Sequence, residues 1–147
     1  MPITDDMVST VRAYLTGDSE KFQRLNAQLD RSPSATRAYL ALVTAAFVEA
    51  VEHRFTAQTP VSEVIDYVAN VRSRSDGVSE NLDPTAAERM IRVVFHDDVD
   101  AKGYDSKTTL GVKMLIASAI MSDEDFDSAE LEAFMDRSRE LATEILG

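Results

Sequence analysis

Residues 38–50 of the chain, Ala-Tyr-Leu-Ala-Leu-Val-Thr-Ala-Ala-Phe-Val-Glu-Ala, carry the most informative pattern in the sequence. A helix through this stretch is apolar around almost its whole circumference, and such a helix is buried on every side. Ser32 can supply an N-cap before it, and Pro33 stands at the favoured first helical position. We therefore predict a long central helix over residues 33–55, with other helices packed around it.

A second apolar stretch predicts a second central helix, over residues 106–121. Lys113 and Ser118 are the only polar side chains in its run 110–121. The small side chains in this run would let a neighbouring helix approach closely. We therefore expect this helix to pack against the one at 33–55.

The rest of the chain shows amphipathic helical periodicity and no extended β alternation. The few glycines and prolines fall where a helical pattern breaks. At 147 residues the length favours one domain. The prediction is a single all-α domain, 1–147, a compact bundle of about seven helices at 4–15, 19–29, 33–55, 61–72, 84–95, 106–121 and 127–146.

Composition excludes several classes of protein. The chain has no cysteine, which excludes a disulfide framework and thiolate metal sites. It has 26 acidic against 15 basic residues, a net charge of −11, which argues against nucleic-acid binding. No run approaches 18 apolar residues and the first residues do not resemble a signal peptide, so we expect no membrane span and a cytoplasmic location.

The negative charge is concentrated in the second half of the chain. Residues 76–147 hold 17 acidic and seven basic residues, a net charge of −10. On the predicted helix 127–146, an apolar stripe occupies one face. The opposite face carries a row of acids spaced four residues apart: Glu132, Asp136, Glu140 and Glu144.

This acidic row slightly destabilises the helix that carries it. Each like-charge pair costs roughly 0.2–0.5 kcal/mol, and Glu144 near the C-terminal end opposes the helix dipole. Arg137 and Arg139 flank the row and can relieve part of the repulsion through Arg137–Glu140 and Asp136–Arg139 pairs. An ordinary solubilising face is one interpretation. The other is a non-enzymatic interaction or regulatory module whose acidic face binds a basic protein partner.

Two acidic loops suggest an alternative function, the binding of a divalent cation. Asp98, Asp100 and Gly103 match positions 1, 3 and 6 of a calcium loop, but Lys102 occupies position 5 and Thr109 position 12. The stretch 123–128 has acids at positions 1, 3 and 5 but lacks the later ligands. Neither is an EF-hand, and the candidate ligands are Asp98, Asp100, Asp105, Asp123, Asp125, Asp127 and Glu130.

Residues 116–141 also loosely resemble the helix–acidic turn–helix of the TerB-like tellurite-resistance family. Asp123, Asp125, Asp127 and Glu130 carry the resemblance, and Glu124 replaces the characteristic glycine of that turn. The resemblance implies Asp123, Asp127 and Glu130 as cation ligands. The same residues also read as a capping box, with Asp127 as N-cap and Glu130 at N3.

No catalytic motif is present: the chain has no Gly-x-Ser-x-Gly, no Walker loop and no Gly-x-Gly-x-x-Gly. The spacing of the two histidines does not match a di-iron bundle. We therefore expect no enzymatic activity and no cofactor. A third hypothesis is a pocket for a small apolar ligand among the methionines Met90, Met114, Met121 and Met135, although packing is the usual role of such residues.

Overall fold

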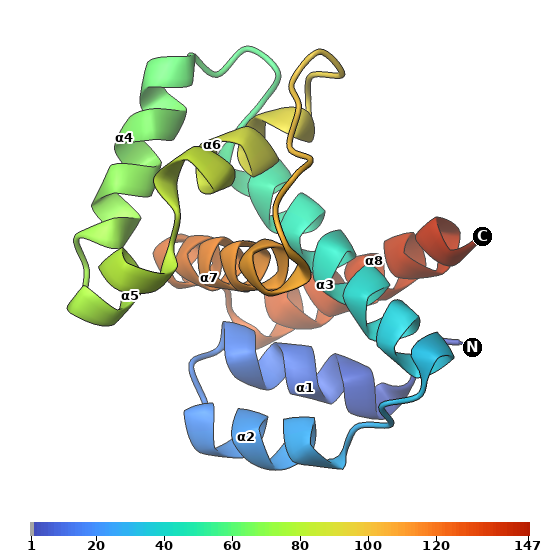
Figure 1. The fold of residues 1–147 in the computed structure, drawn as a ribbon. Coiled ribbons are helices and arrows are strands. Elements are labelled where there is room, and N and C mark those ends of the chain that lie inside the picture. Colours follow the sequence, from blue (N-terminus) through green and yellow to red (C-terminus); the bar gives the residue numbers. More distant parts are fainter. Residues whose placement is uncertain (1) are drawn as a thin grey trace.

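The computed structural model describes residues 2–147, and over this range the chain folds into eight helices and no strand (Figure 1). The prediction of an all-α bundle is therefore confirmed, with one helix more than expected. The helices are α1 (Asp5–Leu15), α2 (Ser19–Gln28), α3 (Pro33–Arg54), α4 (Val61–Arg72), α5 (Asp76–Asn81), α6 (Pro84–Val93), α7 (Ser106–Glu124) and α8 (Ser128–Leu146).

Local capping interactions set where most of these helices begin. The hydroxyl of Ser32 accepts the backbone N–H of Ala35 at the start of α3. At the start of α8, Asp127 accepts the N–H of Glu130 at 2.8 Å, and the Glu130 carboxylate accepts the N–H of Asp127 at 3.2 Å. The predicted N-cap and capping box are both confirmed, because these interactions depend only on neighbouring residues.

Helix α3 lies at the centre of the fold, as its apolar circumference predicts. It contacts α1, α7 and α8, and Figure 1 shows it running diagonally between them. Small side chains such as Ala38, Ala45 and Ala50 are fully buried and allow close approach. The most extensive helix–helix contact is between α3 and α8, and the predicted contact between α3 and α7 is next.

By length and composition alone, α3 is apolar enough to cross a membrane, contrary to the expectation from the sequence. In the structure, 56% of its most apolar 18-residue window is buried inside the protein. The rest of this window is not buried, and Leu40 within it is 39% exposed, so α3 is central but not buried on every side as the sequence pattern predicts.

Helix α5, which the sequence pattern did not predict, contains six residues without apolar periodicity. Ser75 caps it, and Arg72 at the end of α4 holds the following turn. The Arg72 guanidinium donates to the carbonyls of Ser79 and Leu82, each at 2.9 Å. Because Arg72 belongs to α4, the pattern of apolar residues within 76–81 does not indicate these contacts.

Helix α7 is longer than predicted and ends at Glu124 instead of residue 121. Asp125 follows it in the left-handed conformation, with φ 49° and ψ 56°. Aspartate tolerates this conformation better than most residues, although glycine fits it best. Asp123 therefore lies in the last turn of α7 and not in an open acidic loop.

Replacing Asp125 with glycine is expected to stabilise the protein by about 0.5 kcal/mol, because glycine adopts a positive φ without steric cost. Urea denaturation followed by circular dichroism measures this change. The matched control is Asp97→Gly, an exposed position without a positive φ, where we expect no gain. A loss of stability in Asp125→Gly would contradict the prediction.

Candidate functional site

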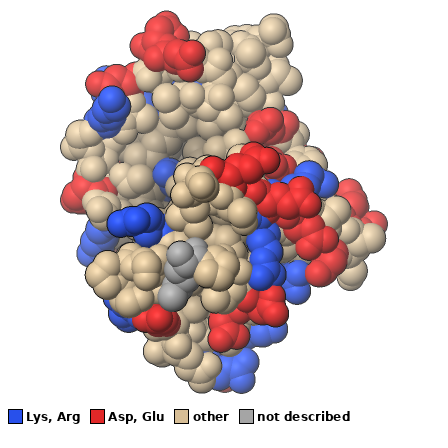
Figure 2. Space-filling model, turned by 90° about the vertical axis from the view of Figure 1, so that its right-hand side faces the viewer, with Lys and Arg blue, Asp and Glu red and all other residues tan. Residues whose placement is uncertain are grey.

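The predicted acidic row lies on the outward face of α8. Glu132, Asp136, Glu140 and Glu144 are all exposed, whereas Phe134 on the opposite face is fully buried. Figure 2 looks onto the side of the molecule where the two termini lie, and it shows a band of acidic side chains beside basic ones.

The two arginines of α8 do not relieve the acidic row in the way the sequence suggested. Arg137 contacts Glu49 of α3, with Nε 3.3 Å from the carboxylate. Arg139 contacts Asp5 at 2.7 Å and donates to the carbonyl of Ile3 at 2.7 Å. The predicted pairs Arg137–Glu140 and Asp136–Arg139 are therefore wrong, because tertiary neighbours provide other acceptors for both guanidinium groups.

The contact at Arg137 also involves His53, the histidine on α3. Glu49 and His53 are four residues apart and share a face of α3, and both contact Arg137. The His53 Nε2 atom lies 3.3 Å from the Arg137 guanidinium, a contact that fits the tautomer in which Nε2 accepts. The His53 ring also packs edge-on against Phe126, with ring centroids 5.0 Å apart. This cluster joins α3 to α8.

Within the acidic row, Glu132 differs from the other three residues. It forms an ion pair with Arg12 of α1 at 2.9 Å. Asp136, Glu140 and Glu144 form no ion pair with any of residues 2–147. Asp136 and Glu140 line a shallow depression together with Arg139 and Thr143. Three neighbouring carboxylates on this face therefore retain their mutual repulsion.

The candidate cation ligands do not converge in the part of the chain that the structure describes. No group of three acidic or histidine side chains there is placed to hold a metal ion. Asp105 caps α7 by accepting the N–H of Thr108, which lowers the pKa of Asp105. Asp100 accepts the N–H of Lys102 at 2.8 Å, and Asp98 is exposed in the same loop.

The second acidic stretch has structural contacts of its own. Asp127 and Glu130 form the capping box of α8, and Asp125 ends α7. Asp123 accepts a hydrogen bond from Arg74 at 2.8 Å and another from the Tyr67 hydroxyl at 2.9 Å. The Arg74 hydrogen bond lowers the pKa of Asp123, and burial, reinforced by the Asp123 contact, raises the pKa of Tyr67. Cation binding by these residues stays a prediction.

Two small cavities lie beside α3 and α7, and of the four methionines in the pocket hypothesis only Met90 lines either of them. One, of about 170 Å³, is lined by residues that include Leu40, Val43 and Leu110. The other, of about 250 Å³, is lined by residues that include Phe47 and Met90. Both have Thr44, Thr109 and Lys113 in their walls, so the two cavities share one polar boundary.

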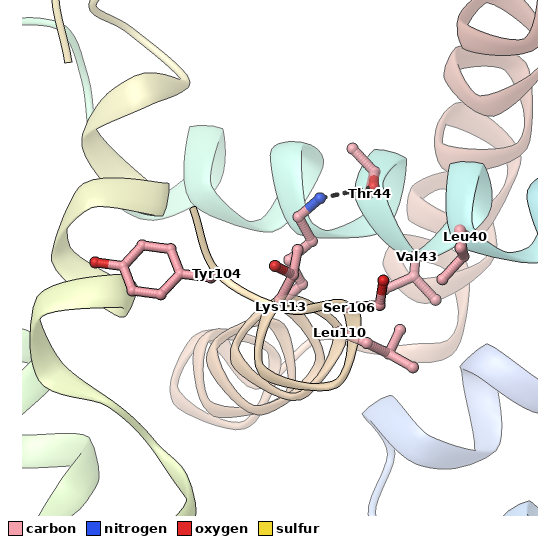
Figure 3. Close-up of a pocket in the computed structure, with 8 residues that line it drawn as sticks. Leu40, Val43, Thr44, Tyr104, Ser106, Leu110 and Lys113 are labelled. Carbon is pink, nitrogen blue, oxygen red and sulfur yellow. Dashed lines mark hydrogen bonds between the residues drawn. The ribbon is translucent and has the colours of Figure 1, made fainter. Parts of the chain in front are cut away.

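Lys113 is the charged residue at this boundary. Figure 3 shows its side chain reaching from α7 to Thr44 on α3, with Leu40, Val43 and Leu110 to one side and Tyr104 to the other. The ammonium donates to the Thr44 hydroxyl at 2.9 Å, and burial lowers the pKa of Lys113. The available sequence signal was a lone lysine within an otherwise apolar helical run.

The four methionines of the pocket hypothesis have different surroundings. Met90 lines the 250 Å³ cavity, and Met121 lines a separate depression with Leu15 and Phe126. Met114 and Met135 are buried in the core. The methionines therefore do not line one shared cavity.

Comparison of the chain with protein-family models, with curated proteins and with solved structures yields no match. The resemblance to the TerB-like family therefore rests on the sequence pattern within residues 116–141 alone.

Proposed function

We propose that this protein is a non-enzymatic, cytoplasmic interaction module that uses the outward face of α8 to bind a basic protein surface. The observation that supports the proposal is that Asp136, Glu140 and Glu144 are exposed without ion-pair partners among residues 2–147. The two arginines on the same helix are engaged by Glu49 and Asp5 instead.

A basic partner would relieve the repulsion along this row. Lysine or arginine side chains of a partner would supply the positive charges that Arg137 and Arg139 do not. Opposite potentials accelerate association and add specificity, and both effects weaken with salt. The proposed interaction is therefore salt-sensitive.

An exposed apolar side chain also lies near the C-terminal end of α8, about 100° around the helix from Glu144. Ile145 follows Glu144 and is 49% exposed, so a partner could cover it. Interfaces combine a buried apolar centre with a polar rim.

The test is to neutralise the unpaired acids and measure partner binding. In an Asp136→Asn, Glu140→Gln, Glu144→Gln variant, we expect loss of the basic proteins that the wild-type chain captures from native lysate. The matched control is Glu20→Gln, Glu80→Gln, Asp97→Asn, which removes the same charge from exposed positions elsewhere. Quantitative mass spectrometry of the captured proteins, at low and high salt, provides the readout.

The control variant should capture the same proteins as the wild type, and their yield should fall as salt rises. Undiminished capture by the α8 variant would contradict the proposal, and so would the absence of any basic protein from the wild-type capture. Circular dichroism establishes that both variants keep the helical fold, which we expect because every substituted side chain is exposed.

A further inference from the structure

The ammonium of Lys113 lies in a largely apolar environment without a negative partner. An ammonium has three N–H donors, and among residues 2–147 this one donates to a single acceptor, the Thr44 hydroxyl. No carboxylate among residues 2–147 forms an ion pair with it. A partly buried charge of this kind is costly unless it is compensated. A bound anion would provide the missing charge and acceptors.

The cavity next to the ammonium is polar at one end and apolar elsewhere. Its polar lining is restricted to Thr44, Thr109 and Lys113. Its remaining lining is apolar: Phe47, Val48, Met90, Val93, Val94 and Ala101. A ligand that matches this lining carries its charge at one end and has an aliphatic body.

We propose that this cavity binds a small aliphatic monocarboxylate, with its carboxylate at Lys113 and its hydrocarbon chain between Phe47, Met90 and Val94. The carboxylate would accept a hydrogen bond from the free donors of the Lys113 ammonium. The Thr44 hydroxyl accepts from Lys113 and still has its own hydrogen to donate to the same carboxylate.

The size and charge of the site narrow the class of ligand. The cavity volume of about 250 Å³ lies below the range of roughly 300–1,000 Å³ typical of sites for drug-sized molecules. One ammonium matches one negative charge. The net charge of −11 on the chain disfavours the approach of polyanions such as nucleotides. A medium-chain fatty acid fits these limits.

The experiment titrates octanoate into the full chain and follows backbone amide shifts by NMR. Octanol, with the same hydrocarbon body and no charge, and acetate, with the charge alone, are the comparison ligands. We expect saturable octanoate shifts around Thr44, Met90 and Lys113. Because a charge-assisted hydrogen bond is lost, octanoate should bind Lys113→Met about ten- to hundredfold more weakly.

Two further variants test whether the carboxylate depends on Lys113 specifically and whether the hydrocarbon chain occupies the apolar end of the cavity. Lys107→Met removes an exposed lysine from the same helix and should leave octanoate affinity unchanged. Ala101→Leu narrows the apolar end and should weaken octanoate and octanol together. Lys113→Met should fold at least as stably as the wild type, because it removes a partly buried charge, and it should retain any binding of octanol.

The proposal is overturned by the absence of saturable octanoate binding to the wild type, by equal octanoate affinity in Lys113→Met, or by acetate binding as tight as octanoate binding. Octanoate shifts confined to the α8 surface would also overturn it, because the ligand would then occupy a different site. The result does not depend on the function proposed for α8.

Discussion

Replacing Phe134 with alanine is expected to lower the free energy of unfolding by about 3–5 kcal/mol. Phe134 is fully buried on the inner face of α8. Its ring packs against Phe126, with centroids 5.9 Å apart, and against His53, with centroids 6.2 Å apart. Truncation removes these contacts and leaves a cavity at the most extensive helix–helix contact of the fold.

Chemical denaturation followed at 222 nm measures this loss. Ile145→Ala on the same helix is the matched control, because its side chain is 49% exposed and its truncation should cost less than about 1 kcal/mol. Since domains of this size are stable by about 5–15 kcal/mol, Phe134→Ala is expected to shift the midpoint strongly. Equal effects of the two substitutions would show that α8 does not contribute to the core in the way described.

Replacing Asp123 with asparagine is expected to destabilise the protein by about 1–1.5 kcal/mol at neutral pH. The carboxylate joins α7 to α4, since it accepts hydrogen bonds from Tyr67 and from Arg74 just beyond α4. Both side chains of the Arg74–Asp123 pair are about one-third exposed, so solvent screening reduces the gain relative to a buried pair.

This stabilisation depends on pH in a defined direction. The Arg74 hydrogen bond, with a smaller contribution from Tyr67, holds the pKa of Asp123 below its usual value of 3.8. The folded state therefore favours the ionised carboxylate. Its contribution to stability is fully present above pH 3.8 and is lost as the pH falls through the lower pKa of the folded state.

The difference in unfolding free energy between wild type and Asp123→Asn should therefore shrink below pH 4. Denaturation curves for the two proteins between pH 7 and pH 2.5 measure it. Glu124→Gln is the control, because the neighbouring Glu124 side chain makes no hydrogen bond or ion pair with residues 2–147. A constant difference across this range would contradict the ionic role of Asp123.

Part of the candidate site was predictable from the sequence. The spacing of Glu132, Asp136, Glu140 and Glu144 places them along one outward face of α8, because side chains four residues apart are neighbours on any helix. The ion pairs of this face were not predictable. Arg139 pairs with Asp5, which is 134 residues away in the chain, and helical spacing carries no information about such a partner.

The same distinction applies to Lys113. Its position in an apolar run indicated an unusual lysine, but its hydrogen bond to Thr44 spans 69 residues. The cavities on both sides exist because α3, α6, α7 and the segment between α6 and α7 leave space where they meet. Only the packing of these segments determines that space.

By itself, the sequence determined the helical class, the central position of α3 and most of the helix starts. These features depend on periodicity and on capping groups within about four residues of each other. The tertiary structure alone decided that Arg137 and Arg139 turn away from the acidic row and that Lys113 borders two cavities. Each of these depends on side chains that only the packing of distant helices brings together, whereas α5 depends on Ser75 and on Arg72 of the preceding helix.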